Sequence, residues 1–154
     1  MAEVRTQDRE ITLNRLLKAP RELVWEAWTK PEHLVHWWGP RGFTITLQQF
    51  DFRPGGRWNF TMHGPDGMNF PNLITFIEIS KPERLVYTTG DGEEDSPGQF
   101  QTTVTFEADG DCTSLTMRML FATAEERDFV VKEYGAIEGG NQTLDQLEEM
   151  LAKL

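Results

Sequence analysis

Residues 100–121, FQTTVTFEADGDCTSLTMRMLF, decide the architecture of this chain. Two runs of alternating residues flank Asp109-Gly110, and this dipeptide between two such runs is a strong hairpin signal, because glycine tolerates the positive φ of a tight turn. One parity of each run is mainly apolar: Thr102, Val104 and Phe106 in the first, and Leu115, Met117, Met119 and Phe121 in the second. We therefore expect two antiparallel strands that turn these side chains toward one face.

Five segments before this hairpin also have the composition of strands. They are residues 10–17, 43–48, 58–63, 70–80 and 84–89. The turn-forming stretches RPGG (53–56) and GPDG (64–67) separate some of them, and a long acidic loop covers residues 90–98. The six consecutive strands after residue 40 predict an antiparallel meander.

Two short helices are expected between the first strand and the meander. Pro20 stands where the first helix begins, at a position where its missing N–H costs nothing, and its apolar stripe is Leu23, Val24, Ala27 and Trp28. The second helix opens at Pro31, where Thr29 and Glu32 have capping-box spacing, and it ends at Gly39-Pro40. Its predicted apolar stripe is Leu34, Val35 and Trp38.

The C-terminal part of the chain has helical patterns only. Thr123 and Glu126 have capping-box spacing and open a helical segment at 124–134. A longer pattern follows, with its apolar stripe at Ile137, Leu144, Leu147, Met150 and Leu151. Because the meander must bury its apolar face, this last helix should lie across it. The prediction is an α+β fold with a six- to seven-stranded curved sheet around a long C-terminal helix, and a cavity between them.

Composition limits the classes of function. The 154 residues fit one domain, residues 1–154, with residues 1–9 expected to be a flexible N-terminus. A formal charge of −10 argues against binding to nucleic acid. Because no run approaches the length of a membrane span, no membrane insertion is expected. The single cysteine, Cys112, and the charged start of the chain indicate a cytoplasmic protein.

The adjacent residues Trp37 and Trp38 could each lie in the core or at a binding surface. The two side chains differ by about 100° around a helix, so they cannot share one environment. Trp38 lies one turn from Leu34 and is predicted to join the core. Trp37 shares a face with His33 and is expected either at a cavity rim or partner contact, or in ordinary packing.

The candidate ligand site combines large side chains on the sheet with two glycines on the last helix. Gly139-Gly140 has two interpretations: a break, with the helix starting at Asn141, or a bare helix surface that leaves room for a ligand. The facing strand residues are either solid core or a cavity lining. The predicted ligand-binding set is Trp37, Trp58, Phe60, Met62, Tyr87, Met117, Met119, Gly139 and Gly140.

Signals for metal binding or catalysis are weak. His33 and His36 are three residues apart, but no third ligand is suggested nearby, so no metal or other cofactor is expected. Cys112 has no base or orienting group in the sequence pattern. An enzyme would need polar groups to converge, and the residues most able to reach a pocket are Glu78, Tyr87, Arg118 and Tyr134. No catalytic residue is assigned, and an enzyme is the less favoured interpretation.

Four runs in order carry a family resemblance: AWTKPEHLVHWWGPRGF, RPGGRWNFTMHGPDG, IEISKPERLVYT and EERDFVVKEYGAIEGGNQTLDQLEEML. The chain resembles, from about residue 11 to 151, the bacterial proteins related to the C-terminal domain of the activator of Hsp90 ATPase. These belong to the START-like (SRPBCC) helix-grip superfamily, and the resemblance implies a helix-grip fold with an internal cavity. The superfamily hosts binders, enzymes and co-chaperones.

Three functions follow as hypotheses. The leading one is a protein that binds a small apolar or amphipathic molecule between the last helix and the sheet. The second, which the resemblance implies, is a chaperone-related protein-interaction domain like the Hsp90 activator. The third is a cyclase-like enzyme.

Overall fold

A computed structural model describes residues 3–5, 9–90, 100–134 and 136–153. Within these residues one antiparallel sheet has the strand order β1-β2-β8-β7-β6-β5-β4-β3. Its strands are β1 (Glu3–Arg5), β2 (Glu10–Leu17), β3 (Thr44–Phe50), β4 (Arg57–His63), β5 (Asn69–Ser80), β6 (Arg84–Gly90), β7 (Phe100–Asp109) and β8 (Cys112–Leu120). The helices are α1 (Arg21–Thr29), α2 (Pro31–Trp37), α3 (Ala124–Tyr134) and α4 (Ala136–Leu151).

The meander is confirmed: β3 to β8 are neighbours in chain order, and β2 adds to the free side of β8. The β7–β8 hairpin closes at the predicted turn, where Asp109 pairs with Cys112 and Gly110 has φ +60°. Only glycine adopts this conformation without steric cost. Within the first nine residues, Glu3–Arg5 forms the three-residue strand β1 and pairs with β2.

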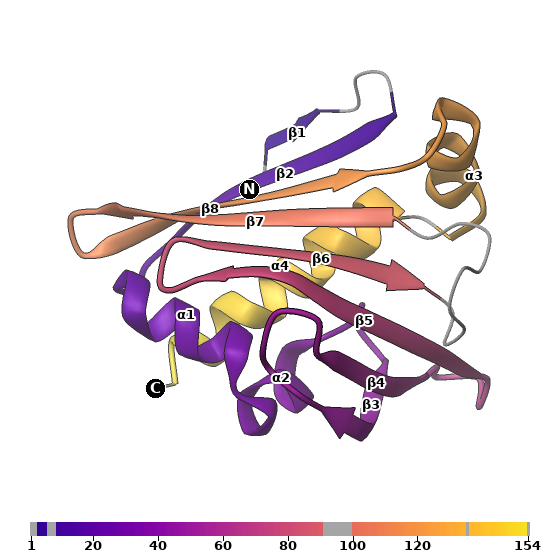
Figure 1. Ribbon diagram of the computed structural model, residues 1–154, viewed down its shortest axis with the longest axis horizontal. Helices are drawn as coiled ribbons and strands as arrows, with labels where there is room; N and C mark the ends of the chain where they lie inside the picture. The colour runs from indigo at the N-terminus through magenta and orange to yellow at the C-terminus, as the bar shows by residue number, and fades with distance from the viewer. Residues whose placement is uncertain (1–2, 6–8, 91–99, 135, 154) are drawn as a thin grey trace.

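Helix α4 crosses one face of the curved sheet, as the helix-grip prediction requires (Figure 1). Helices α1 and α2 lie at one end of the sheet and α3 lies at the other (Figure 1). The sheet residues that face α4 are the predicted parity, and Leu115 and Phe106 are almost completely buried. Leu144 and Leu147 of α4 are completely buried in the same hydrophobic core.

Polar contacts hold α4 in its position along the sheet. Arg15 of β2 is only 5% exposed, and its guanidinium binds Asp145 of α4. Gln146 donates a hydrogen bond to the Gly39 carbonyl, and Arg41 binds Glu149. The contacts of Gln146 and Glu149 place the chain after α2 along the later turns of α4, and Pro40 of the same segment lies beside Gly139 in the first turns, where the pocket described below is found.

The two predicted capping boxes have different outcomes. The Thr123 hydroxyl accepts a hydrogen bond from the Glu126 N–H at 3.1 Å, which is one half of the predicted box, while Oε2 of Glu126 is buried without a hydrogen-bond partner among the described residues. The box at Thr29 does not form, because Thr29 donates instead to the Trp25 carbonyl within α1 and Lys30 is the N-cap of α2.

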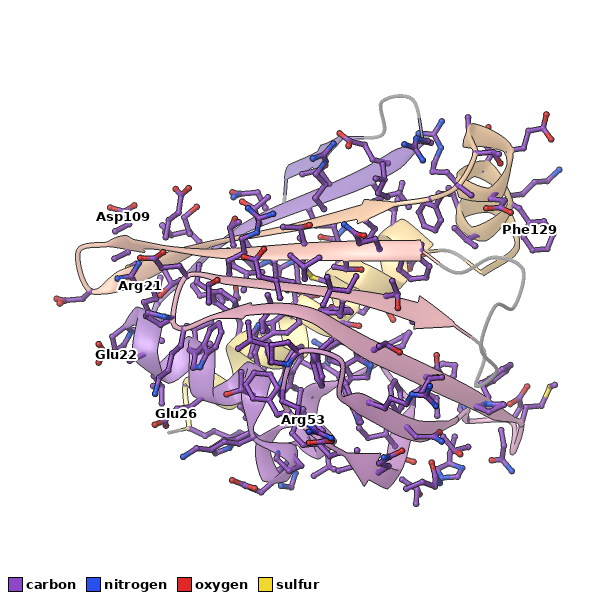
Figure 2. All side chains as sticks on the ribbon, in the orientation of Figure 1. Arg21, Glu22, Glu26, Arg53, Asp109 and Phe129 are labelled. Atoms are coloured by element: carbon purple, nitrogen blue, oxygen red, sulfur yellow. The ribbon has the colours of Figure 1, made fainter. Side chains whose placement is uncertain are left out.

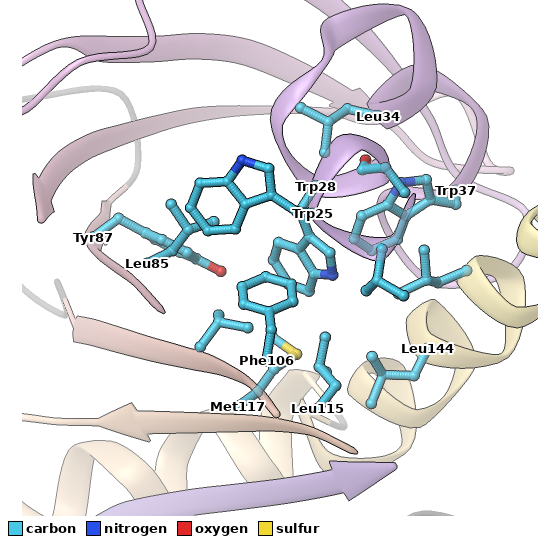
Figure 3. Packing of buried hydrophobic residues seen from close by; sticks show 14 of the residues in the cluster. Trp25, Trp28, Leu34, Trp37, Leu85, Tyr87, Phe106, Leu115, Met117 and Leu144 are labelled. Atoms are coloured by element: carbon cyan, nitrogen blue, oxygen red, sulfur yellow. The ribbon is translucent and has the colours of Figure 1, made fainter. Parts of the chain in front are cut away.

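An aromatic cluster fills the space between α1, α2 and the sheet. The ring of Trp28 makes edge contacts with Trp37, Trp38 and Phe106 at centroid distances of 4.9, 5.6 and 6.0 Å. Figure 3 shows Trp37 on the α4 side of this cluster. Such edge-to-face contacts add to the apolar area that the rings bury.

Candidate ligand-binding pocket

A pocket of about 250 Å³ lies between the first turns of α4, the inner face of β4–β8 and the segment after α2. Its walls are mainly apolar. The lining residues are Trp38, Gly39, Pro40, Phe60, Met62, Asn72, Tyr87, Thr89, Phe100, Thr102, Met117, Met119, Gly139, Gly140 and Thr143. Phe60, Tyr87 and Thr102 are buried, whereas Pro40, Asn72 and Thr89 are half-buried. The pocket therefore has a buried floor on the sheet and a partly exposed rim.

Most of the predicted ligand-binding set meets here. The structure brings together Phe60, Met62, Tyr87, Met117, Met119, Gly139 and Gly140. Cross-strand register explains the grouping, since Tyr87 pairs with Thr102 and Thr102 pairs with Met119 across three adjacent strands. Residues in one such row point to the same face of a sheet.

Trp37 is not among the residues that line the pocket and lies in the packed core, which agrees with the second of its two interpretations. Trp37 is 1% exposed and donates its indole N–H to the Ala27 carbonyl at 3.0 Å. The half-buried Trp38 lines the pocket instead. The physical reason is the helix end: α2 stops at Trp37, and Trp38 has the extended dihedrals φ −69° and ψ 133°. Helical spacing from Leu34 therefore no longer applies to Trp38.

Trp58 is also absent from the pocket wall. It is 2% exposed, and its ring stacks on Phe60 at 4.4 Å and meets Trp38 at 4.7 Å. Both of these neighbours line the pocket. Trp58 thus packs behind the wall and supports it.

The two glycines lie within a continuous helix, so the interpretation of a break before Asn141 is wrong. A Cβ built on Gly140 would come 2.6 Å from Cδ1 of Leu13, which is completely buried. A Cβ on Gly139 would meet only the Pro40 ring, at 3.4 Å. Gly140 therefore permits close approach of α4 to β2, while Gly139 leaves space at the pocket.

The prediction missed several lining residues. Thr102 had a usable signal, because it is a polar residue on the inward parity of an otherwise apolar strand. Pro40, Asn72 and Thr143 had none, since they meet only through the packing of distant segments.

The pocket has no charged side chain among its described lining residues, and its deepest polar groups are two hydroxyls. Tyr87 is 4% exposed and Thr102 is 1% exposed, and their side chains share a hydrogen bond. Figure 3 shows the Tyr87 hydroxyl directed into the interior. Burial raises the pKa of the Tyr87 phenol, and the hydrogen bond from Thr102 opposes this shift to a smaller extent.

This raised pKa predicts how Tyr87 responds to alkali. The folded protein keeps the phenol proton where the unfolded chain loses it, so the stabilising contribution is complete below about pH 10 and declines as pH rises further toward the folded pKa. We expect the near-ultraviolet difference between the native wild type and Tyr87→Phe to show no phenolate step near pH 10. The same difference measured in urea should show that step. A native step near pH 10 would mean that water reaches the phenol.

The polar residues considered for catalysis do not converge on the pocket. Glu78 pairs with Arg84, and Arg118 pairs with Glu10, each outside the lining set. Tyr87 is the one of these candidates that lines it, while the side chain of Tyr134 lies outside the described part of the chain. The arrangement suits binding, since it places apolar surface around one hydroxyl pair.

The histidines and the cysteine are separate from the pocket lining. His63 contacts Thr46 and Asn69 at 2.7 Å each, at the end of β4. No group of three or more His, Cys, Asp or Glu side chains in the described ranges has the geometry to hold a metal ion. The charged side chains of Arg21, Glu22, Glu26 and Asp109 lie at the left edge of the molecule in Figure 2.

A curved antiparallel sheet that grips a C-terminal helix, with an apolar pocket between them, defines a START-like helix-grip protein. The chain belongs to the family described as activator of Hsp90 ATPase homolog 1-like protein, whose model matches residues 18–152. Membership of this family indicates a ligand-binding domain or a domain like the Hsp90 activator, and it does not identify a ligand. A search of curated proteins finds no match.

Solved structures of bacterial proteins share this fold. A protein from Nitrosomonas europaea is 29% identical with a TM-score of 0.82, and the alignment covers 94% of each chain. A Mycobacterium smegmatis protein is 25% identical with a TM-score of 0.87, covering 99% of this chain and 97% of that one. A protein from Arthrobacter aurescens reaches a TM-score of 0.90 at 24% identity, covering 100% and 92%. Among the described helices, none combines the length and apolar character needed to cross a membrane.

Proposed function

We propose that the protein binds a small apolar molecule in the pocket between α4 and the sheet. The observation that carries this proposal is the pocket itself: about 250 Å³ of space bounded mainly by aromatic rings, methionines and glycine. Ligand pockets are typically concave and mainly apolar, and this space beside Gly139, with its buried floor and partly exposed rim, has that character.

The size of the pocket limits the occupant. An apolar cavity of about 150 Å³ stays dry and accepts benzene. By proportion, the pocket here suits a molecule of roughly ten non-hydrogen atoms. At about 0.5 kcal/mol per such atom, the dissociation constant would be on the order of 0.1 mM for a simple hydrocarbon of this size.

Indane is a suitable probe, because it is an uncharged hydrocarbon of about this size. We expect a saturable titration by calorimetry, with two-dimensional NMR showing that the Trp38 indole signal shifts more than the Trp37 signal. The variant Gly139→Leu should lose this binding, because its side chain extends from α4 into the pocket. Its free energy of unfolding should change by only about 1 kcal/mol in either direction, as improved helix propensity offsets crowding.

Glu138→Leu is the matched control, because it adds the same side chain at the preceding, exposed position of α4. Its indane affinity should equal that of the wild type. Absence of saturable binding to the wild type would overturn the proposal, as would equal binding by a stable Gly139→Leu variant. Native mass spectrometry of protein purified from cells would identify an occupant as added mass that disappears on denaturation.

The family description supports a second candidate, a protein-interaction domain that stimulates Hsp90. Its measurable consequence is faster ATP hydrolysis by purified Hsp90 when the protein is added. The Gly139→Leu variant separates the two functions, because a surface interaction should survive filling of the pocket.

A further inference from the structure

The Tyr87–Thr102 pair lies on the pocket floor and is buried, whereas the other polar side chains of the lining, Asn72, Thr89 and Thr143, are half-buried. The two residues are directly opposite each other on β6 and β7, and both line the pocket. With 4% and 1% exposure, their hydroxyl groups have little access to bulk water. A hydroxyl of this pair that lacks a hydrogen-bond partner would therefore cost about 1–3 kcal/mol of free energy.

The hydrogen bond between the two hydroxyls leaves one of their O–H donors unused. Two hydroxyls carry two protons, and the single hydrogen bond between them uses one. One O–H donor thus remains for whatever occupies the pocket.

The absence of charged side chains in the described lining further limits which molecules can bind in the pocket. None of the lining side chains in the described ranges is positively charged, and the whole chain carries a formal charge of −10. A carboxylate moved into this pocket would lose its hydration and find no cation, which is strongly unfavourable. A tyrosine phenol is neutral at neutral pH and burial raises the pKa of Tyr87 further, so the floor offers a hydrogen-bond donor without a charge.

We propose that the pocket selects uncharged apolar molecules that carry a hydrogen-bond acceptor such as a carbonyl oxygen, which accepts a hydrogen bond from the Tyr87–Thr102 hydroxyl pair. This inference rests on the proposed function and narrows its ligand class. It assigns the pair the role of a specificity determinant: the apolar walls supply affinity for any hydrocarbon of the right size, and the hydroxyl pair discriminates among them.

The test compares three probes of similar size by calorimetry: indane, the ketone 1-indanone and the anion phenylacetate. With the wild type, phenylacetate should bind at least about a hundredfold more weakly than 1-indanone, since its charge has no partner. The double variant Tyr87→Phe/Thr102→Val removes both hydroxyls with little change of shape. It should weaken 1-indanone binding about tenfold, the usual effect of one lost hydrogen bond, and leave indane within about twofold.

Each single variant then locates the donor, because the hydroxyl that contacts the ketone accounts for more of the loss. Thr103→Val is the matched control: it makes the same substitution at the next position of β7, whose side chain points to the opposite face. It should leave the affinities for both neutral probes unchanged.

The outcomes separate the two proposals. If the wild type binds indane and 1-indanone but the double variant weakens both equally, the hydroxyl pair does not recognise an acceptor and this inference fails while the pocket stands. Tight binding of phenylacetate would also overturn it. If the wild type binds neither neutral probe, both proposals fail.

Discussion

Replacing Trp37 with alanine is expected to lower the free energy of unfolding by about 3–5 kcal/mol, the usual cost of truncating a buried tryptophan. Trp37 is 1% exposed, and its ring lies 4.9 Å from that of Trp28 and 5.3 Å from that of Trp38. The substitution removes these contacts, leaves a cavity between α2 and the aromatic cluster, and leaves the Ala27 carbonyl without its indole donor. Urea unfolding followed by far-ultraviolet circular dichroism measures the loss.

Trp38→Ala is the natural comparison, because it removes the same side chain one residue later. Trp38 is half-buried and borders the pocket, so its removal enlarges an existing space and should cost clearly less than removal of Trp37. The packing described for the two tryptophans would be contradicted if Trp38→Ala cost more than Trp37→Ala.

The adjacent glycines of α4 should respond in opposite ways to the same small change. Gly140→Ala is expected to destabilise the protein by about 1–2 kcal/mol, because its Cβ would come 2.6 Å from Cδ1 of Leu13. Leu13 is completely buried and has little room to withdraw. Gly139→Ala meets only the Pro40 ring at 3.4 Å. It should stabilise the protein by about 0.5–1 kcal/mol through higher helix propensity.

A double-mutant cycle tests the cause of the Gly140 effect. Leu13→Val shortens the side chain that the new methyl group would strike, so Gly140→Ala should cost less in that background than in the wild type. Thermal and urea unfolding of the four proteins gives the coupling energy. Additive effects would show that the contact with Leu13 is not the reason for glycine at this position.

The candidate site was partly predictable, because the alternation of side chains along a strand can be read from the local sequence. Phe60, Met117 and Met119 were identified by strand parity, which determines the face of the sheet that a side chain occupies. The same rule misplaced Trp58, since parity cannot distinguish a side chain on a pocket wall from one packed behind it. Trp38 was predicted to lie in the core because helical spacing was extended one residue beyond the end of α2, and spacing could not separate the two interpretations of Trp37.

Sequence alone determined the meander and its hairpins, since the Asp109-Gly110 turn and the alternation on both sides of it depend only on local backbone preferences and burial of one face. It also indicated the long C-terminal helix that this face requires. Tertiary structure decided where space remains. The pocket depends on how closely α4 approaches β2 at Gly140 and on where the segment after α2 lies. It also depends on the pairing of β6 with β7, which places Tyr87 opposite Thr102. These are distances between segments far apart in the chain, and no local preference encodes them.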